Sequence, residues 1–119
     1  MFYTVADPLA QLTAAINNTE VAIDKNAADI AAVVENLKTV AIELSEAKEM
    51  LRRSDLSAED KDYWRNEKKT LGNKEEQLRN KEDKLIDEKK TLAEKRDKLL
   101  AERKTLTMIG ALNLSVPLS

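Results

Sequence analysis

Isoleucine or leucine recurs at every seventh position through the first part of the chain, at Leu9, Ile16, Ile23, Ile30, Leu37, Leu44 and Leu51. A second and less apolar series follows three residues after these, at Leu12, Thr19, Asn26, Val33, Val40 and Ala47. The two series occupy the a and d positions of a heptad repeat, the apolar side of a coiled-coil helix. Asp7 is a suitable N-cap, and Pro8 suits the first helical position. The pattern therefore predicts a helix over residues 8–53, preceded by an extended arm over residues 1–7.

Another heptad series, in a different phase, runs through the rest of the chain, at Trp64, Leu71, Leu78, Leu85, Leu92, Leu99 and Leu106. The residues between these positions are mostly charged, so this segment supplies one apolar residue per heptad where a two-stranded coiled coil normally uses two. Ser57 can cap a helix, and Glu59 and Asp60 place negative charge in its first turn, where the helix dipole favours it. We therefore predict a second helix over residues 58–109, with Gly110 directly after its end.

The phases of the two series do not join across residues 54–57. Continuing the first register past Leu51 would place a positions at Ala58 and Arg65, which the second series does not follow. A turn removes this mismatch, whereas a continuous rod would have to absorb it as a defect in the coiled coil. After Gly110, apolar residues occupy alternate positions, and a period of two predicts an extended tail over residues 110–119.

These elements predict an all-α fold, a long antiparallel helical hairpin (a coiled coil) with short extended terminal segments. A turn centred between residues 55 and 56 places level with each other residues whose numbers add to 111. The facing pairs are then Ala47 with Trp64, Val40 with Leu71, Val33 with Leu78, Asn26 with Leu85, Thr19 with Leu92, and Leu12 with Leu99. Trp64 and the six leucines are therefore predicted to pack the hairpin against the d positions of the first helix.

The a positions of the first helix receive much less cover in such a hairpin, because charged residues such as Glu67 and Lys74 lie opposite them. A long exposed apolar stripe favours association. The predicted function is thus a non-enzymatic oligomerisation or spacer module, which leaves dimer, trimer and tetramer open. An adaptor that binds the helix of a different protein is the alternative. The predicted interface consists of Leu9, Leu12, Ile16, Ile23, Asn26, Ile30, Val33, Leu37, Val40, Leu44 and Leu51.

Two positions in these series allow more than one interpretation. Asn26 at a d position is the kind of polar layer that sets register at a cost in stability. It is also compatible with a polar layer at the centre of a parallel trimer, where it could hold an anion. Trp64 either fills the last layer of the hairpin beside the small Ala47 or forms a binding hot spot with Tyr63 near the tip.

The composition favours long helices over a compact globule, because charged residues make up 35% of the chain and aromatic residues only 3%. The chain contains no cysteine and no histidine, which excludes disulfides and the commonest metal ligand. The acidic pairs that begin at Glu75 and Glu82 alternate with lysine and arginine, so ion pairs such as Glu75–Arg79 and Glu94–Lys98 explain them. We therefore predict no enzyme activity, no catalytic residue, no cofactor and no metal site.

A net charge of −2 argues against a nucleic-acid partner. No apolar run approaches the roughly 18 residues of a membrane span, and neither helix combines a basic and an apolar side as membrane-surface helices do. No secretory signal is visible at the start of the sequence. The compartment is thus not assigned, and a cytoplasmic location is the default expectation.

The segment from Asp62 to Leu106, which begins DYWRNEKKTLGNKEEQLRNKEDKLIDEKKTL, resembles the Lys/Glu/Leu heptad tracts of fungal and oomycete crinkler-type proteins. In that family such tracts precede variable C-terminal effector domains. The resemblance implies a coiled-coil connector in a larger effector-like or toxin-like protein, and it transfers no catalytic residue. The ubiquitin-like header and the effector domain of that family are not visible in these 119 residues.

Overall fold

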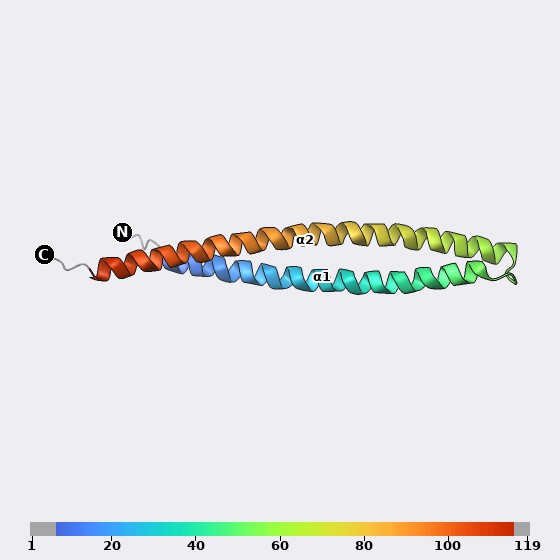
Figure 1. Cartoon of the computed structure of the whole chain (residues 1–119), viewed down its shortest axis with the longest axis horizontal. Coiled ribbons are helices and arrows are strands. Elements are labelled where there is room, and N and C mark those ends of the chain that lie inside the picture. The colour runs from blue at the N-terminus through green and yellow to red at the C-terminus, as the bar shows by residue number, and fades with distance from the viewer. Residues whose placement is uncertain (1–6, 116–119) are drawn as a thin grey trace, which may run out of the picture. The chain divides into compact units, whose positions relative to one another are not determined.

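The computed structural model describes the backbone of residues 7–115 and the side chains of residues 7–110. Two helices, α1 (Pro8–Arg52) and α2 (Ala58–Ser115), follow each other along the chain (Figure 1). Residues 53–57 join them, so the chain is the predicted all-α helical hairpin. The extended arm predicted for residues 1–7 lies outside the described residues, apart from Asp7.

Side-chain caps start both helices. At the start of α1, Asp7 Oδ1 accepts a hydrogen bond from the backbone N–H of Leu9 at 3.1 Å, which confirms Asp7 as the N-cap. At the start of α2, Ser57 Oγ accepts a hydrogen bond from the backbone N–H of Asp60, also at 3.1 Å. Each cap satisfies a donor that the first turn of a helix leaves without an intrahelical partner.

The end of α1 lies one residue earlier than predicted, at Arg52. The backbone N–H of Arg53 donates to the carbonyl oxygen of Met50 at 3.2 Å. A bond that spans three residues is tighter than an α-helical one and is common where a helix ends. The turn between the helices therefore begins at Arg53, and Leu56 is half-buried within it.

The prediction of an extended tail from Gly110 is wrong for residues 110–115, because α2 continues to Ser115. Among the described residues no glycine has a positive φ, so Gly110 lacks the left-handed conformation of a residue that ends a helix. An existing helix extends readily, because the unfavourable step is nucleation and each added residue forms another hydrogen bond. One glycine in a helix costs only about 1 kcal/mol relative to alanine. The alternating positions of Leu112 and Leu114 therefore did not prevent the helix from continuing through them. The rest of the predicted tail, residues 116–119, lies outside the described residues.

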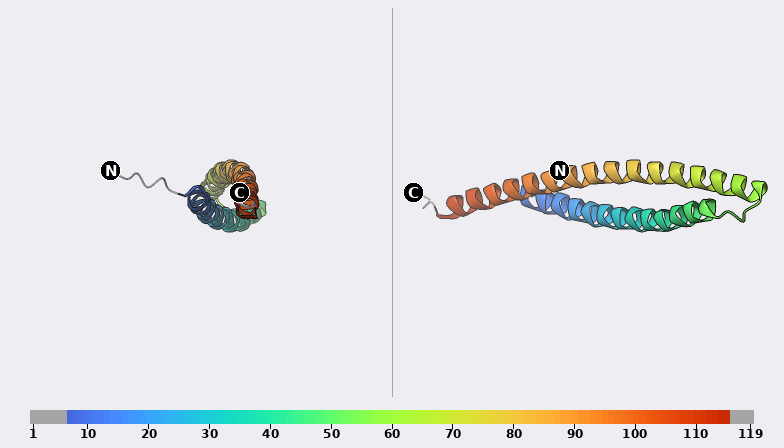
Figure 2. Two further views of the ribbon diagram at one scale, coloured as in Figure 1. Left: turned by 90° about the vertical axis from the view of Figure 1, so that its left-hand side faces the viewer. Right: turned by 45° about the vertical axis from the view of Figure 1, so that its right-hand side comes forward.

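The chain divides into two compact units, and each contains a segment of both helices. The loop unit, Ala28–Asp87, contains the end of α1, the turn and the beginning of α2. Its two helical segments run antiparallel and side by side in Figure 1 and in the right-hand view of Figure 2. The terminal unit combines the two outer segments, Met1–Ala27 and Glu88–Ser119, so the start of α1 packs with the end of α2.

The d positions of α1 form the centre of each unit. In the loop unit Val33, Val40 and Ala47 are 0–2% exposed, and Leu71 of α2 is 6% exposed. In the terminal unit the d residues Thr19 and Asn26 are 3% and 2% exposed, and Ile16 at an a position is 2% exposed. The Thr19 hydroxyl donates to the carbonyl oxygen of Ala15 at 2.8 Å, so this buried polar side chain is hydrogen-bonded within its own helix.

Candidate oligomerisation surface

The leucine series of α2 contributes the other side of the buried centre. Leu71 is buried, whereas Trp64, Leu78, Leu85, Leu92, Leu99 and Leu106 are half-buried. Because five residues join helices that end at Arg52 and begin at Ala58, residues of the loop unit whose numbers add to about 110 lie level. This places Trp64 close to the height of the fully buried Ala47. Tyr63 meets Trp64 edge-to-face, with ring centroids 5.2 Å apart, and stays 58% exposed.

The a positions of α1 form a row beside the buried d positions. We call the half-buried members of this series the a row: Leu9, Ile23, Ile30, Leu37, Leu44 and Leu51. A step of three residues turns a helix by about 300°, so the a row lies about 60° around α1 from the d positions. The contact with α2 is centred on d, and each a-row side chain therefore keeps part of its surface exposed. The opposite flank of the d positions carries Asp29, Asn36 and Glu43 in its middle and alanine or methionine elsewhere, so the flank with the a row is the more apolar one.

Four residues of the predicted interface are already buried within a single chain. Ile16, Asn26, Val33 and Val40 are 0–2% exposed. Side chains without accessible surface cannot contact a second copy unless the hairpin opens, so we remove these four from the candidate surface. The other seven are half-buried, namely Leu12 and the six residues of the a row. Whether they form an interface stays a prediction.

Charged side chains of α2 line the edge of the a row. In the loop unit, Leu51 shares an open groove of about 540 Å³ with Lys61, Arg65, Lys68 and Lys69. The stems of such side chains cover apolar surface while their charged ends stay in water. This cover explains why Leu51 is half-buried instead of fully exposed.

In the terminal unit, Leu12 lines a groove of about 420 Å³ with four residues of α2: Ala101, Glu102, Thr105 and Leu106. All four follow Leu99, the residue predicted to face Leu12. The groove therefore joins the start of α1 to the part of α2 that follows Leu99. Further along α2, Met108 and Ile109 are 57% and 47% exposed.

A third apolar series on α1 was missed by the sequence prediction. The residues four positions after each a position, which are e positions of the heptad, are Thr13, Glu20, Ala27, Val34, Ala41 and Lys48. A step of four residues places them about 40° from the a row, on the side away from the d positions. Val34 is half-buried, and the other five are exposed. The signal was visible in the sequence, because the middle three members are apolar. Next to the a row, α1 thus carries small or apolar side chains at the three middle e positions, Ala27, Val34 and Ala41.

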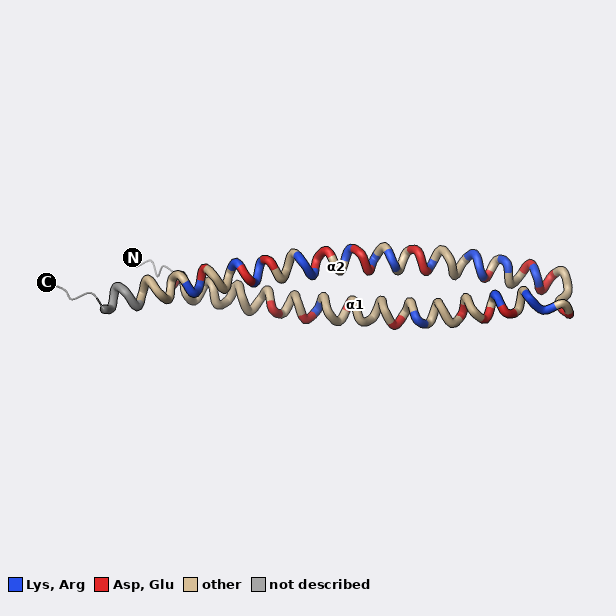
Figure 3. Tube along the Cα trace, in the orientation of Figure 1, with Lys and Arg blue, Asp and Glu red and all other residues tan. Residues whose placement is uncertain are grey.

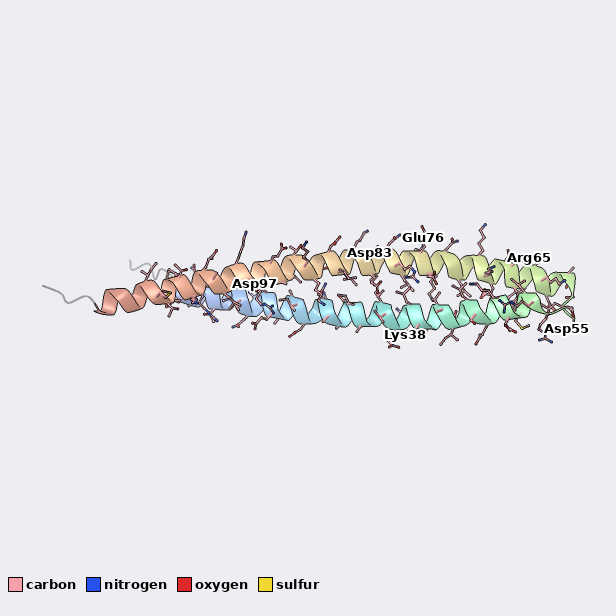
Figure 4. All side chains as sticks on the ribbon, in the orientation of Figure 1. Lys38, Asp55, Arg65, Glu76, Asp83 and Asp97 are labelled. Carbon is pink, nitrogen blue, oxygen red and sulfur yellow. The ribbon has the colours of Figure 1, made fainter. Side chains whose placement is uncertain are left out.

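Charged residues lie mainly on α2, where acidic and basic residues alternate (Figure 3). The predicted ion pair between Glu75 and Arg79 is present at 3.6 Å. The pair predicted between Glu94 and Lys98 is not among the ion pairs of the described residues. In the loop unit, Lys38 on α1 and Glu76 on α2 point away from the contact between the helices (Figure 4).

Neither a metal site nor a membrane span is found in the described part of the chain. No group of three or more acidic, cysteine or histidine side chains there could hold a metal ion. Over the same residues, neither helix contains an apolar stretch that could cross a bilayer.

No family model, no curated protein and no solved structure matches the chain. The likeness of residues 62–106 to crinkler-type heptad tracts therefore stays a prediction.

Proposed function

We propose that the protein is a non-enzymatic coiled-coil module that assembles with further copies of itself through the a row of α1. The observation that carries this proposal is the half-buried state of the a row. The neighbouring d positions from Thr19 to Ala47 are buried, so they are already covered within the single chain. Burial of the d positions completes the hairpin, whereas the isoleucines and leucines of the a row keep part of their apolar surface in water. Association removes this surface from water, and each Å² of apolar area contributes about 25 cal/mol.

In this assembly α2 packs on α1 within each hairpin and lies on the outside, away from the contact between copies. One leucine per heptad is sufficient to cover the d positions of α1, and the remaining positions of α2 are mostly charged. A surface with mixed charges remains soluble and does not favour contacts of α2 with itself. The resemblance of residues 62–106 to crinkler-type connectors supports a related form of the same function, as the coiled-coil part of a larger effector-like protein.

Light scattering on purified protein tests the proposal. We expect the wild-type chain to have a multiple of the monomer mass of 13.4 kDa. Substituting Ile30→Asp in the a row should lower this mass, because a carboxylate is costly to bury in an apolar interface. Ile42→Asp is the matched control, since Ile42 lies on the opposite side of α1 and is 61% exposed. An unchanged mass for Ile30→Asp, or an equal loss for both variants, would contradict the proposal.

The adaptor alternative makes a different prediction for the same samples. If the a row binds a helix of another protein, the purified wild-type chain has the monomer mass or aggregates. The groove at Leu12 favours this alternative, because Ala101 and Leu106 of α2 add apolar surface to that of Leu12 and could receive an apolar side chain of a partner helix. Monomeric wild-type protein would therefore replace self-assembly with the adaptor function.

A further inference from the structure

The a row and the adjacent e positions form a nearly symmetric pattern along α1. Between residues 20 and 48, the e positions read Glu20, Ala27, Val34, Ala41 and Lys48. Val34 is the midpoint, alanines lie seven residues to either side of it, and opposite charges lie fourteen residues to either side. Glu20 and Lys48 are both exposed, and neither takes part in an ion pair within the described residues. The pattern therefore carries opposite charges at its two ends.

We infer that the partner of this surface is a second copy of the chain that lies antiparallel on it, centred on Val34. This inference rests on the proposed function, and it specifies the orientation and the centre of that self-association. The two α1 helices are related by a twofold axis that passes beside Val34. Each copy uses the a row together with the e positions, on the flank of α1 beside its contact with α2.

In this orientation, apolar side chains of the two copies face each other along the middle of the interface. Side chains of opposite charge face each other at its two ends. Residues of the two copies whose numbers add to 68 lie level with each other. Ala27 then faces Ala41 of the second copy, and Val34 faces its own counterpart. In the a row, Ile23 lies within about 1.5 Å of the level of Leu44 of the second copy, and Ile30 lies equally close to the level of Leu37. Glu20 faces Lys48 of the second copy, and the symmetry forms this pair twice.

A parallel arrangement in register uses the same apolar residues but places the charges differently. Glu20 would then face Glu20 of the second copy, and Lys48 would face Lys48. Like charges at neighbouring positions destabilise a helical contact, whereas opposite charges stabilise it modestly. Apolar burial is similar in the two arrangements, so the end charges decide the orientation. The alanines at positions 27 and 41 also allow the helices to approach closely on either side of Val34.

Charge reversal tests the contact between Glu20 and Lys48. Glu20→Lys and Lys48→Glu should each weaken association about five-fold or more, because each places like charges at both ends of the interface. The double variant restores the opposite charges and should recover wild-type affinity. Glu46→Lys is the control, since Glu46 is exposed on the far side of α1. The affinities can be measured by sedimentation equilibrium.

Spin-label distances on single-cysteine variants test the orientation directly, since the wild-type chain contains no cysteine. Labels at positions 35 and 49, both on the far side of α1, report the level of each residue in the two copies. In the antiparallel dimer, label 35 lies within about 3 Å of the level of its counterpart, whereas the two labels at position 49 are about 45 Å apart along the helices. A dimer in which both labels give equally short distances, or whose affinity is insensitive to the charge reversals, overturns the antiparallel contact and leaves self-assembly standing. Monomeric wild-type protein overturns both proposals.

Discussion

Arg53 and Asp55 form a two-pronged ion pair in the turn between the helices. Arg53 Nη2 lies 2.7 Å from Asp55 Oδ2, and Arg53 Nε donates to Asp55 Oδ1 at 3.0 Å. These hydrogen bonds hold the pKa of Asp55 below its ordinary value of 3.8, and they raise the pKa of Arg53. The pair connects the residue directly after α1 to the middle of the turn, so it helps to set where the chain reverses.

The lowered pKa of Asp55 predicts a stability contribution that depends on pH. A carboxyl group with a lower pKa in the folded state stabilises the fold above its unfolded pKa, and this contribution is lost as pH falls through the folded value. Asp55→Asn should therefore unfold at a lower temperature than the wild type at pH 7, and the gap should close below about pH 3.8. Asp83→Asn, on an exposed face of α2, is the control. A gap that stays constant down to pH 2 would show that the ion pair does not contribute.

The cap at Ser57 predicts a loss of stability when its hydroxyl is removed. Ser57→Ala deletes the acceptor of the Asp60 N–H, and losses of this kind cost about 1 kcal/mol. Ser54→Ala in the same turn should change the free energy of unfolding by less than about 0.5 kcal/mol, since it is an exposed position away from the caps. Urea unfolding followed by circular dichroism measures both. Equal effects would mean that the cap does not stabilise α2.

Truncating the buried Val40 side chain tests how much the d positions contribute to the stability of the fold. The Val40 side chain is 0% exposed, so Val40→Ala leaves a cavity and should lower the free energy of unfolding by about 1–3 kcal/mol. Val21 is 68% exposed on α1, and Val21→Ala should be neutral or slightly stabilising because alanine is the better helix former. The variants must be compared at one protein concentration, because association would also shift the apparent stability. Similar losses for both would argue against a buried centre at the d positions.

Replacing Gly72 with alanine should stabilise the protein. Gly72 lies inside α2 on the exposed side, and a Cβ atom added there would meet no heavy atom within 4 Å. Gly72→Ala should therefore stabilise the helix by about 0.5–1 kcal/mol, which a thermal melt detects as a higher Tm. Gly110→Ala, equally open but near the end of α2, should raise the Tm less. A loss of stability for Gly72→Ala would reveal a close contact at this position that the single hairpin does not contain.

Local signals predicted the elements of the fold well. The heptad spacing of α1, the Asp7 and Ser57 caps and the phase break after Leu51 are all properties of short segments, so they could be recognised without a structure. The prediction of the tail used an equally local signal but neglected propagation. Once α2 is formed, Gly110 alone is too weak to end it, and the helix extends to Ser115.

The candidate surface could be predicted only in part. Ile30 and Val33 are equally apolar in the sequence, and a heptad pattern does not say which one the same chain covers. The structure makes this distinction, since Val33 is 2% exposed and Ile30 is half-buried. The e positions were missed for a related reason. Ala27 and Ala41 have little hydrophobic area of their own. They extend an apolar surface only because the a row beside them is partly exposed.

Intermolecular nuclear Overhauser effects between an isotope-labelled and an unlabelled copy test whether the chains assemble through the a row. Mixed samples report which methyl groups contact another chain. We predict intermolecular signals from the methyl groups of Ile30 and Leu37, and purely intramolecular signals from those of Val33 and Val40. Intermolecular signals from Val40, or their absence from Ile30 in an associated sample, would show that the a row is not the surface through which the chains assemble.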